Sequence, residues 1–136
     1  MRQASPSAAG KGATRAGWAL SGLAILFFAM DGAMKAALLP VVSETSAQLG
    51  WPADSGTILA LAALLLGSTL LYAIPRTAML GAILLTGYLG GAVATHVRVG
   101  SPLFSHVLFG VYLGIIVWGG LWLRDPRLRA LIPLRD

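Results

Sequence analysis

The sequence predicts an all-α integral membrane protein, an antiparallel four-helix bundle with both termini in the cytoplasm. Of its 136 residues, 57% are hydrophobic and only 11% are charged, and the mean hydropathy is +0.78. A soluble domain carries roughly 25% charged residues, so this much apolar surface requires lipid rather than a larger core. The apolar residues form four long segments without the period-two alternation of β-strands, which indicates helices that span the membrane.

Four membrane-spanning helices are expected at about 16–39, 55–74, 77–96 and 102–123. Segments of about 20 apolar residues are long enough to cross a hydrocarbon core of about 30 Å. Pro40 should end the first helix, and Pro75 with Arg76 should break the chain between the second and third. Because the connections are short, neighbouring helices are expected to run antiparallel.

Polar residues mark the helix starts and the segments outside the membrane. Asp54 or Ser55 is expected to cap the second helix, and Ser101 the fourth, with Pro102 at its first helical position. Residues 40–52 are predicted to be a loop. Two further polar segments are predicted to be basic cytoplasmic tails, the first of them disordered: residues 1–15 and 126–136. A basic stretch before an apolar run is also typical of a signal peptide, but no small-x-small cleavage site follows at the right distance.

The basic residues predict the orientation of the bundle. A net charge of +5 and a pI near 10.5 do not indicate nucleic-acid binding here, because the basic residues stand at the ends of apolar segments. Eight fall on the side of the two termini: Arg2, Lys11, Arg15, Arg76, Arg124, Arg127, Arg129 and Arg135. The other side has only Lys35 and Arg98, so the positive-inside rule places both termini in the cytoplasm. Trp18, Tyr72 and Trp122 are then expected in the aromatic belt at the inner interface.

Two glycine pairs predict close helix packing. Gly87 and Gly91, and likewise Gly110 and Gly114, are four residues apart and leave one helix face bare, so that another helix can approach closely. Glycine is also common in membrane helices without such a role. We expect at least one of the two faces to be a helix–helix contact, either within the bundle or in a homo-oligomer.

With this orientation, the remaining titratable groups collect at the outer end of the bundle, and six residues form the predicted polar site: Asp31, Lys35, Thr95, His96, Arg98 and His106. Charges within a span cost roughly 2.5 to 3.5 kcal/mol each, so they tend to be paired or functional. Asp31 and Lys35 are four residues apart with the acid first, which favours a local ion pair. Alternatively, Asp31 pairs with Arg98 across the first and third helices and anchors a polar pocket.

No pattern in the sequence indicates catalysis or a metal site. It has no Gly-rich phosphate loop, no Ser–His–Asp spacing and no pair of carboxylates on one helix, and we predict no catalytic residue and no catalytic activity of the chain alone. The absence of cysteine excludes disulfides and thiolate ligands in this chain. His96 and His106 are expected near the same depth on adjacent helices. They could ligate haem, form interfacial hydrogen bonds or act as a protonation switch near neutral pH.

Several strings resemble the DoxX-like family of small bacterial membrane proteins. They lie at residues 31–35, 74–77, 80–81, 85–98 and 122–127, within a resemblance that covers about residues 18–134. The most specific string is G-Y-L-G-G-A-V-A-T-H-V-R at residues 87–98. The resemblance implies a four-span domain over residues 16–125 in the bacterial cytoplasmic (inner) membrane. The family is named after a small subunit of a thiosulfate:quinone oxidoreductase, which implies a link to membrane oxidoreductase assemblies.

Three functions follow as hypotheses. The chain could be an accessory subunit of a membrane complex, such as a quinone-linked redox complex, with its outer polar cluster as a docking or quinone-headgroup site. It could instead be a small transporter or permeability protein, or a membrane assembly factor. The expected partners are the lipid bilayer, a larger membrane oxidoreductase and a second copy of the chain, but no nucleic acid. The sequence itself implies no cofactor, although quinone or haem is compatible with it.

Overall fold

The computed structural model describes residues 8–134, which are helical throughout apart from short connections. The elements are α1 (Ala8–Ala36), α2 (Pro40–Gln48), α3 (Ser55–Ala73), α4 (Ala78–Val99), the π-helical turn η1 (Leu103–Val107), α5 (Phe109–Arg124) and α6 (Pro126–Arg129). By length and composition, four stretches could cross a membrane: α1, α3, α4 and the continuous stretch of η1 and α5. The predicted all-α bundle of four apolar helices is therefore confirmed.

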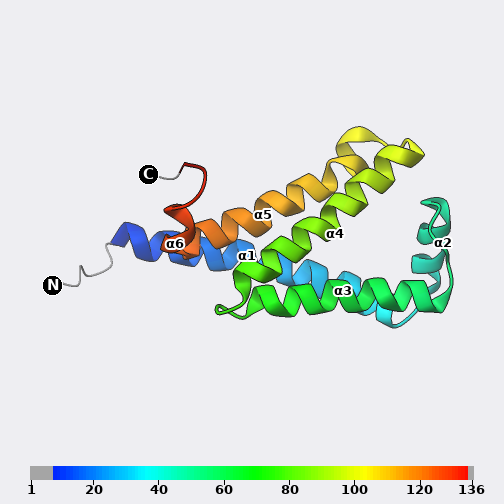
Figure 1. Cartoon of the computed structure of the whole chain (residues 1–136), viewed down its shortest axis with the longest axis horizontal. Helices are drawn as coiled ribbons and strands as arrows, with labels where there is room; N and C mark the ends of the chain where they lie inside the picture. Colours follow the sequence, from blue (N-terminus) through cyan, green and yellow to red (C-terminus); the bar gives the residue numbers. More distant parts are fainter. Residues whose placement is uncertain (1–7, 135–136) are drawn as a thin grey trace.

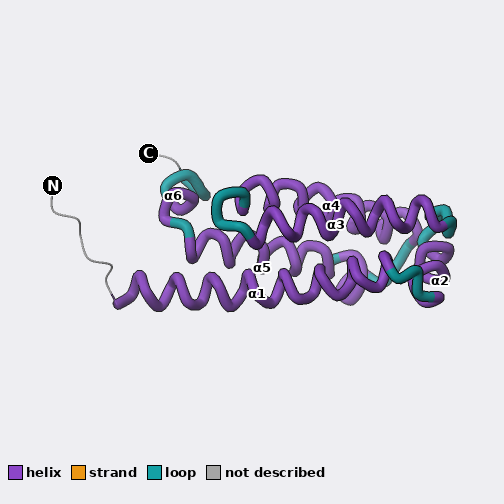
Figure 2. The backbone as a smooth tube through the Cα atoms, turned by 90° about the horizontal axis from the view of Figure 1, so that it is seen from below, coloured by secondary structure: helices purple, strands orange, loops and turns teal. Residues whose placement is uncertain are grey.

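The four long helices form a ring, each packed mainly against two neighbours. α1 and α4 each contact both α3 and α5, so α1 and α4 lie diagonally across the ring. The first turns of α1 lie at the same end as α6, which we call the α6 end, and α2 and η1 lie at the opposite end, the α2 end (Figures 1 and 2). In Figure 1, α4 and α5 lean away from α1 and α3 toward the α2 end, so the bundle is wider there.

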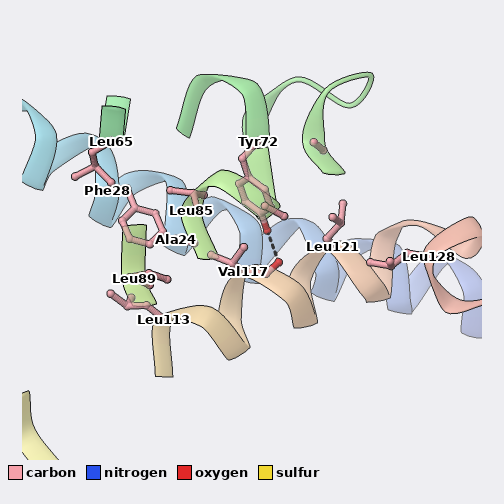
Figure 3. Close-up of a cluster of buried hydrophobic side chains, with 12 residues drawn as sticks. Ala24, Phe28, Leu65, Tyr72, Leu85, Leu89, Leu113, Val117, Leu121 and Leu128 are labelled. Carbon is pink, nitrogen blue, oxygen red and sulfur yellow. Dashed lines mark hydrogen bonds between the residues drawn. The ribbon is translucent and has the colours of Figure 1, made fainter. Parts of the chain in front are cut away.

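The core occupies the middle of the ring and extends toward the α6 end (Figure 3). Leu65 and Leu85 are fully buried, whereas Leu26 on the outside is 68% exposed, as expected where lipid covers the surface. Tyr72 is also fully buried, and its hydroxyl lies 2.6 Å from the Val117 carbonyl oxygen, to which it donates. The prediction that Tyr72 belongs to the interfacial belt is therefore wrong, because its hydroxyl finds partners inside the bundle.

Arg124 joins three helices at the α6 end. Its Nε donates to the Ser21 hydroxyl on α1 at 3.0 Å, and its NH2 group donates to the Tyr72 carbonyl oxygen on α3 at 3.3 Å. Its guanidinium also lies 4.0 Å from the centre of the Trp18 ring. Ser21 is fully buried and lies 2.9 Å from the Tyr72 hydroxyl. A single cation from α5 thus donates hydrogen bonds to polar groups of both α1 and α3.

Both predicted tails contain structure. α1 begins at Ala8, so the expected disordered tail is wrong for residues 8–15, while residues 1–7 lie outside the described residues. Alanine and basic residues are good helix formers, and this segment continues the helix without needing an apolar face. At the other terminus, Leu128 of α6 is 1% exposed and Trp122 donates from Nε1 to the Ile132 carbonyl oxygen at 2.9 Å. The C-terminal segment is therefore held against α5 up to Ile132, Leu134 is 83% exposed, and residues 135–136 lie outside the described part.

Two predictions at the α2 end are also wrong. Residues 40–52 are not entirely a loop, because α2 starts at Pro40, where the missing N–H is tolerated, and Val42 is 9% exposed. The fourth span keeps its predicted place but starts with the π-helical turn η1, and its predicted cap is wrong, because Pro102 rather than Ser101 is the residue before η1. The amides of both His106 and Val107 donate to the Pro102 carbonyl oxygen, each at 3.1 Å, which gives the turn its wider π-helical form.

Asp54 is the N-cap of α3, which confirms one of the two predicted alternatives, Asp54 and Ser55. One carboxylate oxygen accepts from the Thr57 amide and the other from the Thr57 hydroxyl, both at 2.8 Å. These bonds lower the pKa of Asp54 below its ordinary value of 3.8, and the bond from the Thr57 backbone amide has the largest effect. A carboxylate whose pKa is lower in the folded state than in the unfolded state stabilises the fold when the pH is above its unfolded-state pKa. This stabilisation is lost as the pH falls through the folded-state pKa.

We therefore expect the Asp54→Asn variant to lose this acid-dependent part of its stability. Asparagine is also a good N-cap residue, so the helix start should be retained near neutral pH. The measurement is the melting temperature in detergent as pH falls below 4, with Glu44→Gln, at an exposed position of α2, as the control. An unchanged pH profile in Asp54→Asn would contradict the assignment.

Candidate functional site at the α2 end

A cavity of about 280 Å³ lies where α1, α2, α3 and α4 meet at the α2 end. Its polar lining comes from Asp31, Lys35, Thr45, Ser46, Tyr88 and His96. Its apolar lining comes from Met34, Val41, Val42, Leu49, Trp51, Leu61 and Ala92. The space exists because α4 leans away from α1 and α3 here and α2 crosses the end of the bundle (Figure 1). A few polar groups set in an apolar wall are typical of binding sites for small molecules.

Asp31 and Lys35 form an ion pair on one side of the cavity. The Lys35 ammonium lies 2.7 Å from the Asp31 carboxylate, and the two side chains are 18% and 37% exposed, respectively. This is the local pair that the i, i+4 spacing predicts. Arg98 instead donates to the Leu49 carbonyl oxygen at 2.9 Å. The alternative Asp31–Arg98 pair is not formed, because α1 and α4 lie diagonally across the ring and the cavity separates them.

The two predicted histidines lie together, although only one lines the cavity. The rings of His96 and His106 are 5.7 Å apart between centroids and meet edge to face. The Nδ1 atom of His96 lies 2.9 Å from the Ser101 hydroxyl, and that of His106 lies 2.7 Å from the Ser105 hydroxyl. Each serine thus fixes the orientation of one ring. Among the described residues, no third histidine or carboxylate joins them to make a group that could hold a metal ion.

Thr95 and Arg98 lie outside the cavity. Thr95 is 8% exposed, and its hydroxyl donates to the Gly91 carbonyl oxygen of its own helix at 2.8 Å. Arg98 reaches the connection between α2 and α3, where Gly50 has a φ of 76° and a Cβ would come within 2.9 Å of the guanidinium. Of the six predicted site residues, Asp31, Lys35 and His96 therefore line the cavity, and Thr95, Arg98 and His106 do not.

The two glycine pairs behave differently. A Cβ on Gly87 or Gly91 would meet no atom within 4 Å outside its own stretch of helix, so within this chain the predicted close helix contact there is wrong. Both glycines line a groove of about 440 Å³ between α3 and α4. By contrast, a Cβ on Gly110 would lie 3.3 Å from the Leu89 carbonyl oxygen and 2.8 Å from a Val93 methyl group, so α5 does approach α4 closely there. Gly114 has only an ordinary contact, at 4.0 Å from Leu89.

The cavity and this groove adjoin, because they share Trp51, Leu61, Tyr88 and Ala92. Sequence reasoning did not assign Tyr88 to the site, although Tyr88, Ala92 and His96 are four residues apart and share one helix face. It could not have found the lining residues of α2, because α2 itself was predicted to be a loop.

Comparison with known proteins gives one match. The model of the DoxX-like family matches residues 19–120. No match was found among curated proteins or among solved structures.

Proposed function

The chain belongs to the DoxX-like family, and on this premise we propose that it is a non-catalytic accessory subunit of a larger membrane complex. In this proposal, the cavity at the α2 end holds the polar head of a lipophilic redox molecule, a quinone. The complex lies in the bacterial cytoplasmic membrane, with both termini in the cytoplasm and the cavity on the outer side, as the distribution of basic residues predicts. The observation that carries the proposal is a cavity with a few charged and polar groups in its wall that adjoins an apolar groove.

The lining of the cavity suits a small ring that carries carbonyl groups. Lys35 and Tyr88 can donate hydrogen bonds to carbonyl oxygens, and Asp31 holds the Lys35 ammonium in place at 2.7 Å. Aromatic and aliphatic walls from Trp51 and Leu61 would contact the faces of the ring. A volume of about 280 Å³ is near the lower limit for ligand pockets, so it fits a single ring rather than a large solute.

The groove between α3 and α4 is consistent with a ligand that has a long apolar chain. Apart from Ser68, Tyr88 and Thr95, its lining is apolar or glycine, and Gly87 and Gly91 contribute no side chain to it. Because Tyr88 and Ala92 line both spaces, a head in the cavity would place its chain in the groove and then in lipid. The redox partner is supported by the oxidoreductase link that the family resemblance implies.

The test is a gentle detergent pull-down of the tagged chain from membranes, followed by quinone extraction, absorption spectroscopy and mass spectrometry of partners. We expect the natural chain to retain quinone and a larger membrane protein. Asp31→Asn should reduce retained quinone about tenfold, because it removes the carboxylate that holds Lys35, and a charge-assisted hydrogen bond is worth about 1.5 to 3 kcal/mol. Glu44→Gln, on an exposed position of α2 outside the cavity lining, is the matched control.

A second variant separates binding from folding. Ala92→Phe should block the junction of cavity and groove while it leaves the ion pair in place, and it should lower quinone retention without lowering the amount of protein. Equal quinone in all variants would contradict the proposed head site. Solute flux in reconstituted vesicles or loss of a client protein on gene deletion, with no stable partner, would instead support a transporter or an assembly factor.

A further inference from the structure

A second apolar groove, of about 420 Å³, lies at the α6 end, far from the α2 cavity. It is lined by Ile115, Trp118, Gly119, Trp122, Leu128 and Ile132. α5 forms one side, and the C-terminal segment forms the other, held by the bond from Trp122 Nε1 to the Ile132 carbonyl oxygen at 2.9 Å. Gly119 leaves the wall open, since a Cβ there would meet nothing within 4 Å. The lining offers almost only hydrocarbon, which suits an apolar chain.

The groove continues along α5 toward the middle of the bundle. An adjoining groove of about 560 Å³ between α4 and α5 shares Ile115 and Trp118 with it and extends to Gly110. From Gly110 to Trp122 the helix rises about 18 Å at 1.5 Å per residue. One leaflet of a hydrocarbon core is about 15 Å thick, half of about 30 Å. The two grooves together therefore match the length of one lipid acyl chain.

A cation, Arg129, lies beside the groove and has no ion-pair partner within residues 8–134. The Arg129 guanidinium is 5.8 Å from the ring centre of Trp122, which lines the groove. Among the described residues, the ion pairs are Lys35 with Asp31 and Arg127 with Asp125, so the neighbouring acid is already paired. The charge of Arg129 is therefore available to an anion. A guanidinium binds phosphate oxygens through two parallel hydrogen bonds, and tryptophan favours the headgroup region of a bilayer.

We propose that this groove is a binding site for an anionic phospholipid, with one acyl chain against Gly119 and the phosphate on Arg129. The apolar groove provides affinity for the acyl chain, and the Arg129 guanidinium provides the preference for negative charge. The bound lipid would fill the space between α5 and the C-terminal segment and keep that segment at the membrane surface.

The test compares phosphatidylglycerol with phosphatidylcholine of the same chains, by native mass spectrometry of the purified full-length chain in detergent. We expect phosphatidylglycerol to bind about tenfold more tightly than phosphatidylcholine, a ratio within the range that charge-assisted hydrogen bonds give. Arg129→Gln should remove this preference. Arg127→Gln makes the same change in net charge on the same helix, but its side chain is 91% exposed and paired with Asp125, so it should have less than about a twofold effect.

Substitutions that fill the groove test whether the acyl chain binds there. Gly119→Leu should weaken both lipids, whereas Gly12→Leu, at an equally open glycine on α1, should weaken neither. Equal binding of the two lipids, equal effects of Arg129→Gln and Arg127→Gln, or binding of inorganic phosphate as tight as that of phospholipid would each overturn the proposal. It would also fail if Gly119→Leu abolished a dimer of the chain while lipid binding stayed unchanged, because the groove would then be an interface between copies.

Discussion

Substitution of Gly120 by alanine is expected to destabilise the bundle by at least about 2 kcal/mol, the upper part of the range for overpacked cores. A Cβ at Gly120 would lie 2.6 Å from the Ser21 hydroxyl, 2.9 Å from the Ser21 amide nitrogen and 3.0 Å from the Gly17 carbonyl oxygen. Two of these three atoms belong to the backbone of α1, so they cannot move without separating α1 from α5. The reverse view agrees, because a Cβ on Gly17 would lie 2.7 Å from the Gly120 carbonyl oxygen.

The neighbouring residue provides a matched control. A Cβ on Gly119 would meet nothing within 4 Å, so Gly119→Ala should be neutral or stabilising by up to about 1 kcal/mol from helix propensity alone. Thermal and denaturant unfolding in the same detergent measure both variants. Equal stability of Gly120→Ala and Gly119→Ala would show that the close crossing of α1 and α5 does not form.

The glycines show where prediction from sequence reached its limit. Gly87 and Gly91 have the spacing that favours helix packing, yet within the chain they face an open groove. The tightest crossing of α1 and α5 uses Gly17 and Ser21, which have the same small-xxx-small spacing, together with Gly120. Spacing identifies faces on which another helix could lie, but the partner of each face depends on which helices are neighbours in the ring. Sequence alone does not determine that arrangement.

The site was predictable to the extent that it is local. The pair of Asp31 and Lys35 follows from i, i+4 spacing on one helix, and the N-cap at Asp54 follows from its position before an apolar run. The membrane-spanning helices follow from hydropathy in the same way. The cavity did not follow, because one of its sides is α2, a polar helix without apolar periodicity. The contacts of Arg124 with Ser21 and Tyr72 were not predicted either, because a cation at the end of a span resembles an ordinary orientation signal.

Arg124→Gln is expected to destabilise the protein by about 3 kcal/mol or more. It removes two hydrogen bonds from a charged donor, to Ser21 and Tyr72, each worth about 1.5 to 3 kcal/mol, and the contact with the Trp18 ring, worth about 0.5 to 2 kcal/mol. Loss of these donors affects α1 and α3 as well as α5, so we expect a lower midpoint for the whole bundle rather than fraying of one end.

Two comparisons distinguish this role from a simple contribution of charge. Arg127→Gln removes the same charge from a 91% exposed side chain and should change the free energy of unfolding by less than about 0.5 kcal/mol. Arg124→Lys retains the charge but not the planar group that spans Ser21 and Tyr72, so it should recover only part of the loss. If Arg124→Lys were as stable as the natural chain, the cation would act through its charge at the membrane surface. The hydrogen bonds to Ser21 and Tyr72 would then contribute little to holding the three helices together.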